Sequence, residues 1–474
     1  MILTEIEYSP IEAFRRLQHL RHPVFLDSAR FHADHGRSSI LAADPRLVLR
    51  AAGDETTLVA RPGCVTVGGD PWEVLDAMLS RFRLPDTAGW TTFPGGAAIG
   101  FLSYDLGRWL ERIPPPRPSP LPAPEMWFGF YDVLLIFDHL KKQGWIISSG
   151  LDETGVTSER EAAFRRDQFL DELQSDISLF PSRHTRAPQI QPLVAQPDFE
   201  EGVRRALRYI RQGDIYQVNL SHPFRGTVSE PPQELYLRLR QSNPAPFAAY
   251  LDFGAGQILS SSPERFLRMH RRSVQSRPIK GTCPRTGSSH VDWKAAGALV
   301  RSAKNRAELL MITDLLRNDL GKVADFGSVT VPDLVRLEEY ETVFHLVSTI
   351  EASLRPPMMH LDAVAACFPG GSITGAPKLR AMEIIHELEP YGRGIYTGSL
   401  GYLGFNGVSD FNILIRTLLH VGGEVSFHAG GGIVADSDPT LEYEETLHKA
   451  RGLLSLWPGK GMEVPTRRRL ESSE

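Results

Sequence analysis

The sequence predicts an α+β fold with extensive antiparallel sheet. Of its 474 residues, 42% are apolar and 23% are charged, which is the composition of a globular protein with a large core. Residues 216–221 alternate apolar with polar side chains, as a strand does, and long helix-like segments lie between such strands. The two kinds of segment do not follow the strand–helix–strand rhythm of a parallel sheet, so antiparallel pairing is favoured.

Bulk properties exclude several classes of protein. The net charge is −5, and apart from Arg467–Arg469 no basic run points to nucleic acid. The start has no basic segment followed by an apolar one, and no apolar run reaches the ~18 residues of a membrane span. Cys64, Cys283 and Cys367 are too far apart to predict a disulfide framework or a zinc cluster. We therefore expect a reducing, cytoplasmic compartment.

Composition divides the chain into two regions and a tail. Residues 1–180 mix strands, helices and many turns, and residues 182–197 lack periodicity and are typical of a linker. The pattern becomes sharper over residues 198–456. Residues 457–474 are polar and are predicted to form a disordered tail.

Several elements can be expected in order along the chain. Seven prolines in residues 114–124 predict a semi-rigid surface loop, and residues 126–138, MWFGFYDVLLIFD, predict one strand. A charged helix is expected over residues 158–176. Apolar residues at helical spacing predict another helix over residues 199–210, with Gly213 as its stop.

Two residues in the second region are candidates for acid–base or nucleophilic chemistry. Lys280, in PIKGT, lies in a segment that is otherwise typical of a buried strand, and a buried lysine readily becomes a neutral nucleophile. Glu264, in SSPERF, follows a proline and precedes an apolar strand, where a carboxyl group can act as a general acid. The alternatives are a surface lysine at a strand end and a loop glutamate paired with Arg265.

Acidic residues on two predicted helices are candidates for a metal site. Glu308 lies beside the apolar stripe of the helix NRAELLMITDLLRNDLG. Asp438 and Pro439 predict the start of a second helix, which presents Glu442 and Glu445 on one face. Such carboxylates suit Mg²⁺, although acidic residues in a first helical turn also stabilise the helix dipole without any metal.

Two glycine-rich segments, HAGGGIVADSDP and PGGSITGAPK, allow backbone N–H groups to approach an anion closely. Neither matches a nucleotide-binding loop, so nucleotide binding is not expected. Arg416 is predicted to lie within the strand FNILIRTLL, where its charge needs a carboxylate partner. His345, flanked by apolar residues, is by default a satisfied core histidine.

Together and in this order, these segments resemble one family, the chorismate-utilising enzymes typified by anthranilate synthase component I. The matching segments cover about residues 200–452 and are GDIYQVNLS, SSPERF, PIKGT, LLMITDLLRNDLG, HLVS, FPGGSITGAPK, YTGSLGY, RTL and GGGIVADSDPTLEYEET. In the N-terminal part, FLDSA and the segment GGAAIGFLSYDLGR are similar to the amino-terminal region of the family.

The resemblance implies a fold of two large antiparallel sheets packed together with flanking helices. It also implies a site where Mg²⁺ holds the carboxylate of chorismate, with Glu308 and Glu445 as ligands and Glu442 next to them. His345 would lie beside the substrate ring as a catalytic residue, with Lys280 and Glu264. The substrate-binding residues implied are Gln217, Gly281, Thr282, Thr374, Tyr396, Arg416, Gly430, Gly431 and Gly432.

Two positions distinguish branches of the family. At the PIKGT motif, anthranilate synthases resemble PIAGT, with alanine in place of Lys280, and aminodeoxychorismate synthases resemble PIKGT. In the scheme proposed for the family, the lysine attacks ring C2 and expels the C4 hydroxyl, with Glu264 as acid. Ammonia then attacks C4 and expels the lysine. Isochorismate and salicylate synthases have a lysine in place of Gln217, and glutamine cannot take a proton from water.

The resemblance therefore implies that chorismate is aminated at C4 to 4-amino-4-deoxychorismate, on the route to 4-aminobenzoate and folate. The ammonia would come from a separate glutamine amidotransferase subunit, because no glutaminase segment is attached. Positions at which family members bind tryptophan correspond to Ser28, Arg37, Ser38, Pro246, Phe247 and Ala248. Ala248 departs from the larger residue usual there, so tryptophan binding stays open.

Two other functions compete with this one. The first is anthranilate synthase component I of tryptophan biosynthesis, and Lys280 argues against it. The second is a non-catalytic or regulatory homologue. The presence of a complete set of reactive residues argues against that; the set is Glu264, Lys280, Glu308, His345, Arg416 and Glu445.

Overall fold

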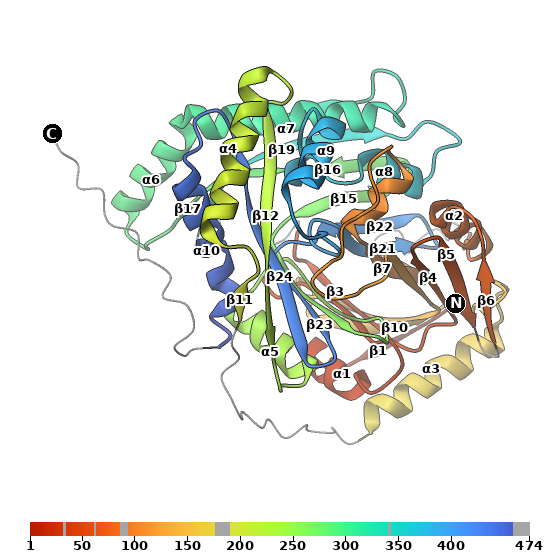
Figure 1. Cartoon of the computed structure of the whole chain (residues 1–474). Helices are drawn as coiled ribbons and strands as arrows, with labels where there is room; N and C mark the ends of the chain where they lie inside the picture. The colour runs from red at the N-terminus through yellow and green to blue at the C-terminus, as the bar shows by residue number, and fades with distance from the viewer. Residues whose placement is uncertain (32–34, 61–62, 86–92, 176–189, 340–342, 458–474) are drawn as a thin grey trace.

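The computed structural model describes residues 1–31, 35–60, 63–85, 93–175, 190–339 and 343–457. Two twelve-stranded sheets pack together, with helices around them (Figure 1). Within the described residues every paired strand is antiparallel, as in the register Asn219↔Gly432, and the predicted α+β fold is confirmed. The predicted tail after Trp457 and half of the predicted linker, residues 182–189, lie outside the described residues. The other half forms a short strand, Gln191–Pro192, and the start of a helix at Gln196.

The elements have the following bounds. The first sheet has the order β1 (Ile2–Ile6), β10 (Gln143–Ser148), β9 (Val133–Asp138), β3 (Ser38–Ala42), β2 (Val24–Asp27), β13 (Phe247–Asp252), β14 (Gln257–Ser262), β23 (Thr417–Val421), β24 (Glu424–Ile433), β12 (Gln217–Thr227) and β11 (Gln191–Pro192), with β20 (Gly375–Ala376) paired to β12. The second has the order β17 (Ile279–Pro284), β19 (Val343–Ser353), β16 (Ser273–Ser276), β15 (Arg265–His270), β22 (Val408–Ile413), β21 (Ser399–Gly404), β7 (Ala97–Leu102), β8 (Met126–Tyr131), β4 (Leu47–Ala52), β5 (Glu55–Ala60) and β6 (Gly63–Val67), with β18 (Thr330–Glu339) paired to β19. The helices are α1 (Pro10–Leu17), α2 (Pro71–Arg81), η1 (Tyr104–Trp109), α3 (Glu159–Gln174), α4 (Gln196–Gln212), α5 (Pro232–Ser242), α6 (Ser289–Arg301), α7 (Ala303–Gly321), α8 (His360–Cys367), η2 (Gly371–Ile373), α9 (Lys378–Leu388) and α10 (Pro439–Leu454), where η1 and η2 are 3₁₀ turns.

Both regions of the sequence contribute strands to both sheets. In the first sheet β2 pairs with β13 through Asp27↔Ala248, and in the second sheet β7 pairs with β21 through Leu102↔Ser399. Residues 1–180 and 198–456 therefore share one pair of sheets and the apolar core between them.

The prediction of a single strand over residues 126–138 is wrong. This stretch forms β8 in one sheet and β9 in the other, and the chain crosses between the sheets at Asp132. The Asp132 carboxylate is 1% exposed and accepts hydrogen bonds of 3.2 and 3.1 Å from Arg165. A buried carboxylate needs such partners, and an apolar strand continuing through this point would not supply them.

Several local predictions are confirmed by the element boundaries. Gly213 ends α4 in the left-handed conformation, with φ of 85°, which glycine adopts without strain. Asp438 caps α10 by accepting hydrogen bonds from the backbone of Thr440 and Leu441. The predicted apolar stripe of α7, which includes Leu309 and Ile312, is buried.

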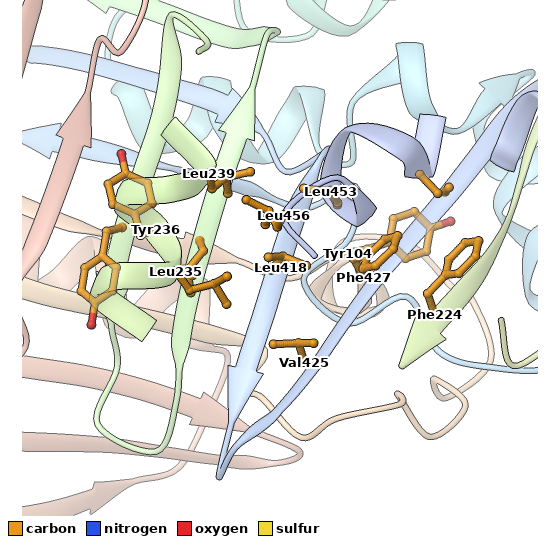
Figure 2. Packing of buried hydrophobic residues seen from close by; sticks show 14 of the residues in the cluster. Tyr104, Phe224, Leu235, Tyr236, Leu239, Leu418, Val425, Phe427, Leu453 and Leu456 are labelled. Carbon is orange, nitrogen blue, oxygen red and sulfur yellow. The ribbon is translucent and has the colours of Figure 1, made fainter. Parts of the chain in front are cut away.

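A large apolar cluster fixes the outer helices to the first sheet (Figure 2). Tyr236 of α5 and Leu453 of α10 belong to the same cluster as Leu418, Val425 and Phe427 of β23 and β24. Leu418 and Val425 have no exposed surface. This packing orients β24 and α10, which both carry residues of the candidate site.

Two further expectations can be compared with the structure. Cys64, Cys283 and Cys367 are all free thiols. Among the described residues there is no helix of the length and apolar character needed to cross a membrane.

Candidate active site

The candidate site lies where β17, the η2 turn and the adjoining ends of β12 and β24 meet. Gln217 at the start of β12 is paired with Ala376 after the η2 turn, and Asn219 is paired with Gly432 of β24. Lys280 of β17 reaches the same turn through a hydrogen bond to Ser372. Segments far apart in the sequence are thus brought to one place.

Lys280 and Glu264 are connected through one residue of the η2 turn. Lys280 Nζ donates to the carbonyl oxygen of Ser372 over 3.2 Å, and Ser372 Oγ donates to Glu264 Oε1 over 2.7 Å. Of the alternative for Glu264, the loop position between β14 and β15 is confirmed and the pairing with Arg265 is wrong. Lys280 is a partly buried strand residue, and Arg265 pairs with Asp410 rather than with Glu264.

Removal from water favours the neutral forms of both groups. Burial raises the pKa of the Glu264 carboxyl above its ordinary value, and this effect exceeds the opposing influence of Lys280 and of the hydrogen bond from Ser372. Burial lowers the pKa of Lys280 below its ordinary value, although Glu264 and Glu308 oppose this. Both pKa shifts are in the direction of a protonated acid and an unprotonated amine, which are the forms that general acid and nucleophilic catalysis need.

A bulge in β17 separates Lys280 from Thr282. Gly281 has a φ of 78°, and the register with β19 shifts between Lys280↔Leu346 and Thr282↔His345. An L side chain is strained at this φ, and a Cβ on Gly281 would also lie 3.0 Å from Asn305 and Leu299 side-chain atoms. The glycine of the PIKGT motif thus has a backbone role.

His345 faces Thr282 across this pair of strands. The distance from its Nδ1 to Thr282 Oγ1 is 2.8 Å. Burial, together with the charge of Arg416, lowers the pKa of His345 to about 4. The imidazole is therefore neutral near pH 7 and is available as a hydrogen-bonding group rather than as a cation.

The glycines of β24 permit close approach of side chains from two directions. A Cβ on Gly432 would lie 2.4 Å from Gln217 Nε2, and a Cβ on Gly431 would lie 3.2 Å from Glu442 Oε2. A Cβ on Gly430 would meet the backbone of β12 at 2.4 Å. Gln217 is 1% exposed, and its Oε1 has no hydrogen-bond partner in the described part of the chain. Such an orphaned acceptor fits a ligand or a buried water.

Glu442 and Glu445 converge on the same glycine. A Cβ on Gly431 would be 3.6 Å from Glu445 Oε1 as well, and Lys449 Nζ lies 2.7 Å from that oxygen. Burial raises the pKa of Glu442, and the charge of Glu445 contributes. Glu308, half-buried on α7, is near enough to Lys280 to influence its pKa. Among the described residues, no group of three or more His, Cys, Asp or Glu side chains is placed to hold a metal ion.

Thr374, which follows the η2 turn directly, and Tyr396 are both buried. Thr374 is completely buried, and its Oγ1 donates to the carbonyl oxygen of Gly370 over 3.0 Å. The ring of Tyr396 stacks on His428 with centroids 5.0 Å apart. Both are therefore rigidly placed residues of the protein interior.

The prediction that Arg416 lies within a strand is wrong. Arg416 follows the end of β22 and precedes β23, with a φ of 50°. Within the described residues no carboxylate forms an ion pair with it, although its charge acts on Glu264. It lines a cavity of about 240 Å³ together with Lys449 and Asn243. The break between the strands leaves the guanidinium at the surface of this cavity.

A second cavity contains all six positions that correspond to tryptophan-binding residues in the family. Its volume is about 390 Å³, and it lies between β2, β3, β13 and β22. Among the residues that line it are Ser28, Arg37, Ser38, Pro246, Phe247 and Ala248. The structure thus brings these six predicted residues together, in a place separate from the group around Lys280.

Sequence reasoning did not identify Ser372, Lys449, Glu389 or Arg393. Ser372 lies inside the quoted motif FPGGSITGAPK, but its contacts with Lys280 and Glu264 depend on a turn that has no periodic signal. Glu389 and Arg393, after α9, are four residues apart. This spacing is typical of exposed ion pairs, so it gives no signal of a buried network.

Comparison with known proteins shows the family. Residues 23–455 match the family of chorismate binding enzymes, and the chain therefore belongs to this family. Aminodeoxychorismate synthase component 1 of Escherichia coli strain K12 is 42% identical over 443 residues, which are 93% of this chain and 94% of that protein. Anthranilate synthase component 1 of Thermus thermophilus is 38% identical over 461 residues, 95% of this chain and 96% of that protein. The crystal structure of anthranilate synthase component I from Streptococcus pneumoniae TIGR4 superposes with a TM-score of 0.79 at 31% identity, covering 94% of this chain and 97% of that one.

The low pKa of His345 leads to a prediction about pH. We expect its imidazole to titrate with a midpoint of about 4, identified in NMR spectra as the histidine signal absent from His345→Gln. The folded pKa lies below the unfolded value of ~6.5, so the unfolded state binds more protons as pH falls from ~6.5 to ~4. Titration of His345 therefore lowers the free energy of unfolding as the pH falls through that window. The free energy of unfolding of His345→Gln should fall less over the same window than that of the wild type. A midpoint near 6.5 in the folded protein would contradict the burial described here.

Proposed function

We propose that the chain aminates chorismate at C4 with ammonia, giving 4-amino-4-deoxychorismate and water. The observation that carries this proposal is the pair formed by Lys280 and Glu264, joined through Ser372 and driven by burial toward neutral forms. A relative at 42% identity is an aminodeoxychorismate synthase component 1, which supports the same reaction for this chain.

The residues can divide the substitution into two steps. The neutral amine of Lys280 forms a bond to ring C2, the double bonds shift, and the C4–O bond breaks. The departing hydroxyl takes the proton of Glu264 and leaves as water. Ammonia then forms a bond to C4, the double bonds shift back, and the bond from C2 to Lys280 breaks. The new ammonium group returns one proton to Glu264, so both side chains end in their starting forms.

Water must be kept from acting as the nucleophile in place of ammonia. Gln217 has an acceptor oxygen but no basic site, so it can orient ammonia and cannot deprotonate water. The alternative function, anthranilate formation, would require ammonia at C2, the position that Lys280 occupies in this scheme. The lysine therefore favours the 4-amino product.

We further propose Mg²⁺ as a cofactor, held by Glu445 and Glu442 with Glu308 as a third candidate. The carboxylate oxygens that converge on Gly431 fit a hard cation, since Mg²⁺ keeps several waters and needs few protein carboxylates. The raised pKa of Glu442 reflects in part its like-charged neighbour, which a cation would neutralise. When bound, the ion would supply positive charge to the carboxylate of the substrate.

The ammonia is proposed to come from a separate glutamine amidotransferase subunit. The chain aligns over 93% of its length with a component 1 protein, which supports a second component. The isolated chain should accordingly use ammonium salts and leave glutamine unchanged.

Lys280 gives the decisive prediction. Lys280→Ala should lower the rate of 4-amino-4-deoxychorismate formation on the order of 10³-fold or more, because the nucleophile is lost. Lys280→Arg should not restore it, since a guanidinium stays protonated. The measurement is product formation from chorismate, Mg²⁺ and ammonium, with products separated by chromatography and identified by mass. Glutamine in place of ammonium is the parallel control.

Intact mass measured with chorismate but without ammonia tests the covalent step itself. We expect an adduct on the wild-type chain and none on Lys280→Ala. Undiminished 4-amino product from Lys280→Ala would refute the mechanism, and anthranilate as the main wild-type product would favour the alternative function.

Substitution of a carboxylate tests the metal proposal. Glu445→Gln should weaken Mg²⁺ binding by about tenfold or more, measured by calorimetry without substrate, and should lower activity in parallel. Glu444→Gln, one residue away on α10, is the matched control and should bind Mg²⁺ as the wild type does. Equal affinity of the Glu445→Gln and wild-type chains would remove Glu445 from the metal site.

We also propose that the cavity of about 390 Å³ binds tryptophan, on the support of the six matching residues that line it. A ligand that binds only the folded state raises the melting temperature as its concentration rises. L-tryptophan at millimolar concentration should therefore raise the Tm, with D-tryptophan as the control ligand. Equal Tm values with the two enantiomers would contradict a specific tryptophan site. The alanine at position 248, where a larger residue is usual, would then be the physical reason for the lack of binding.

A further inference from the structure

Arg393 lies behind the candidate site with every donor satisfied. A guanidinium has five N–H donors in a rigid plane. Nε and Nη2 donate to the two carboxylate oxygens of Glu389 over 2.9 and 2.7 Å. Nη1 donates to the carbonyl oxygen of Ile373 over 3.0 Å and to Thr397 Oγ1 over 3.2 Å, and Nη2 also donates to the carbonyl oxygen of Asn219 over 2.7 Å. Arg393 is only 3% exposed.

Glu389 extends this network to β12. Its Oε1 accepts from both the backbone N–H and the Oγ of Ser221, over 2.8 and 3.0 Å. Arg393 and Glu389 therefore hold β12 at two alternate residues, Asn219 and Ser221, on the face that also carries Gln217.

The other side of the network holds the η2 turn. Ile373, whose carbonyl oxygen accepts from Arg393, lies between Ser372 and Thr374. Ser372 is the residue that contacts both Lys280 and Glu264. The guanidinium also lies 4.8 Å from the ring centroid of Tyr104 and 5.7 Å from that of Tyr396, so it is fixed between two aromatic faces.

We infer that Arg393, oriented by Glu389, is a positioning residue for the reaction at Lys280. It holds the η2 turn against β12 and thereby keeps Ser372 between the amine and the carboxyl. This inference deepens the proposed function and rests on it for the identity of the product. The network itself makes no contact with Lys280 or Glu264 and acts through Ser372.

The variant Arg393→Lys tests this, because it retains a cation but loses the planar set of donors. An ammonium cannot bind Glu389 with two parallel bonds and also reach Ile373 and Asn219. A displacement of about 1 Å in a catalytic group costs on the order of 10²-fold in rate. Arg393→Lys should therefore lower kcat by about that factor.

The chain offers a matched control in Arg165 of α3. Arg165 is 5% exposed, binds both carboxylate oxygens of Asp132 and also pairs with Asp44. It belongs to α3, which lies at the lower right of Figure 1, whereas α9 lies in the upper middle. Arg165→Lys should lower the Tm to a similar degree and leave kcat and KM for chorismate within about twofold, consistent with the additivity of distant sites.

A readout without turnover separates positioning from folding and from the identity of the product. Competitive acetylation followed by peptide mass spectrometry gives the pH at which the Lys280 amine becomes reactive. In Arg393→Lys this midpoint should rise, because a loosened η2 turn admits water to the amine and weakens the effect of burial. In Arg165→Lys the midpoint should stay at the wild-type value.

The outcomes are decisive whichever product is formed. Loss of kcat and a higher Lys280 midpoint in Arg393→Lys alone support the inference, even if the wild-type product is anthranilate. Equal kinetics and equal midpoints in the two variants overturn it. If Arg393→Lys does not fold, Glu389→Gln takes its place, since the amide oxygen still accepts from Ser221 while the ion pair is lost. The same two measurements and the same control then decide the result.

Discussion

Removal of one lysine and one glutamate from water is the constraint on which the rest of the site depends. Opposite charges that touch would stabilise each other as an ion pair, and neither Lys280 nor Glu264 could then act in its neutral form. Ser372 prevents this by offering a carbonyl oxygen to the amine and a hydroxyl to the carboxyl. Within the described part of the chain, both side chains bond to Ser372 and not to each other. The η2 turn therefore separates the two groups, and burial shifts both pKa values toward the neutral forms against the opposing hydrogen bond from Ser372 to Glu264.

The glycines of β24 allow side chains on both faces of the first sheet to approach this strand closely. Successive residues of a strand face opposite sides. Gly432 faces Gln217, whereas Gly431 faces Glu442 and Glu445 of α10. A methyl group at position 432 would lie 2.4 Å from Gln217 Nε2, and one at position 431 would lie 3.2 Å from Glu442 Oε2. The absence of both side chains therefore lets the interior of the sheet and α10 approach one strand closely. The apolar packing of α10 onto the first sheet then maintains this approach.

The sequence alone could predict features whose cause is local. The stop of α4 at Gly213 and the cap of α10 at Asp438 follow from the chemistry of single residues, and the reactive residues followed from ordered motifs. Features that depend on tertiary contacts were not predictable. The chain crosses between sheets at Asp132 because arginines distant in sequence bind its carboxylate. Ser372 and Arg393 likewise have roles only because a turn, a helix end and β12 meet in space.

Burial has different consequences for the lysine and for the arginine near this site. Burial penalises the charge of both side chains, but an ammonium can release its proton at an accessible pH and a guanidinium cannot. At Lys280 burial prevails and lowers the pKa, which is the direction that the proposed nucleophilic role needs. At Arg393 burial also acts to lower the pKa, but Glu389 more than offsets it and raises the pKa above the ordinary value. The same removal from water thus shifts position 280 toward a neutral amine and leaves position 393 a permanently charged support for the turn that lies between them.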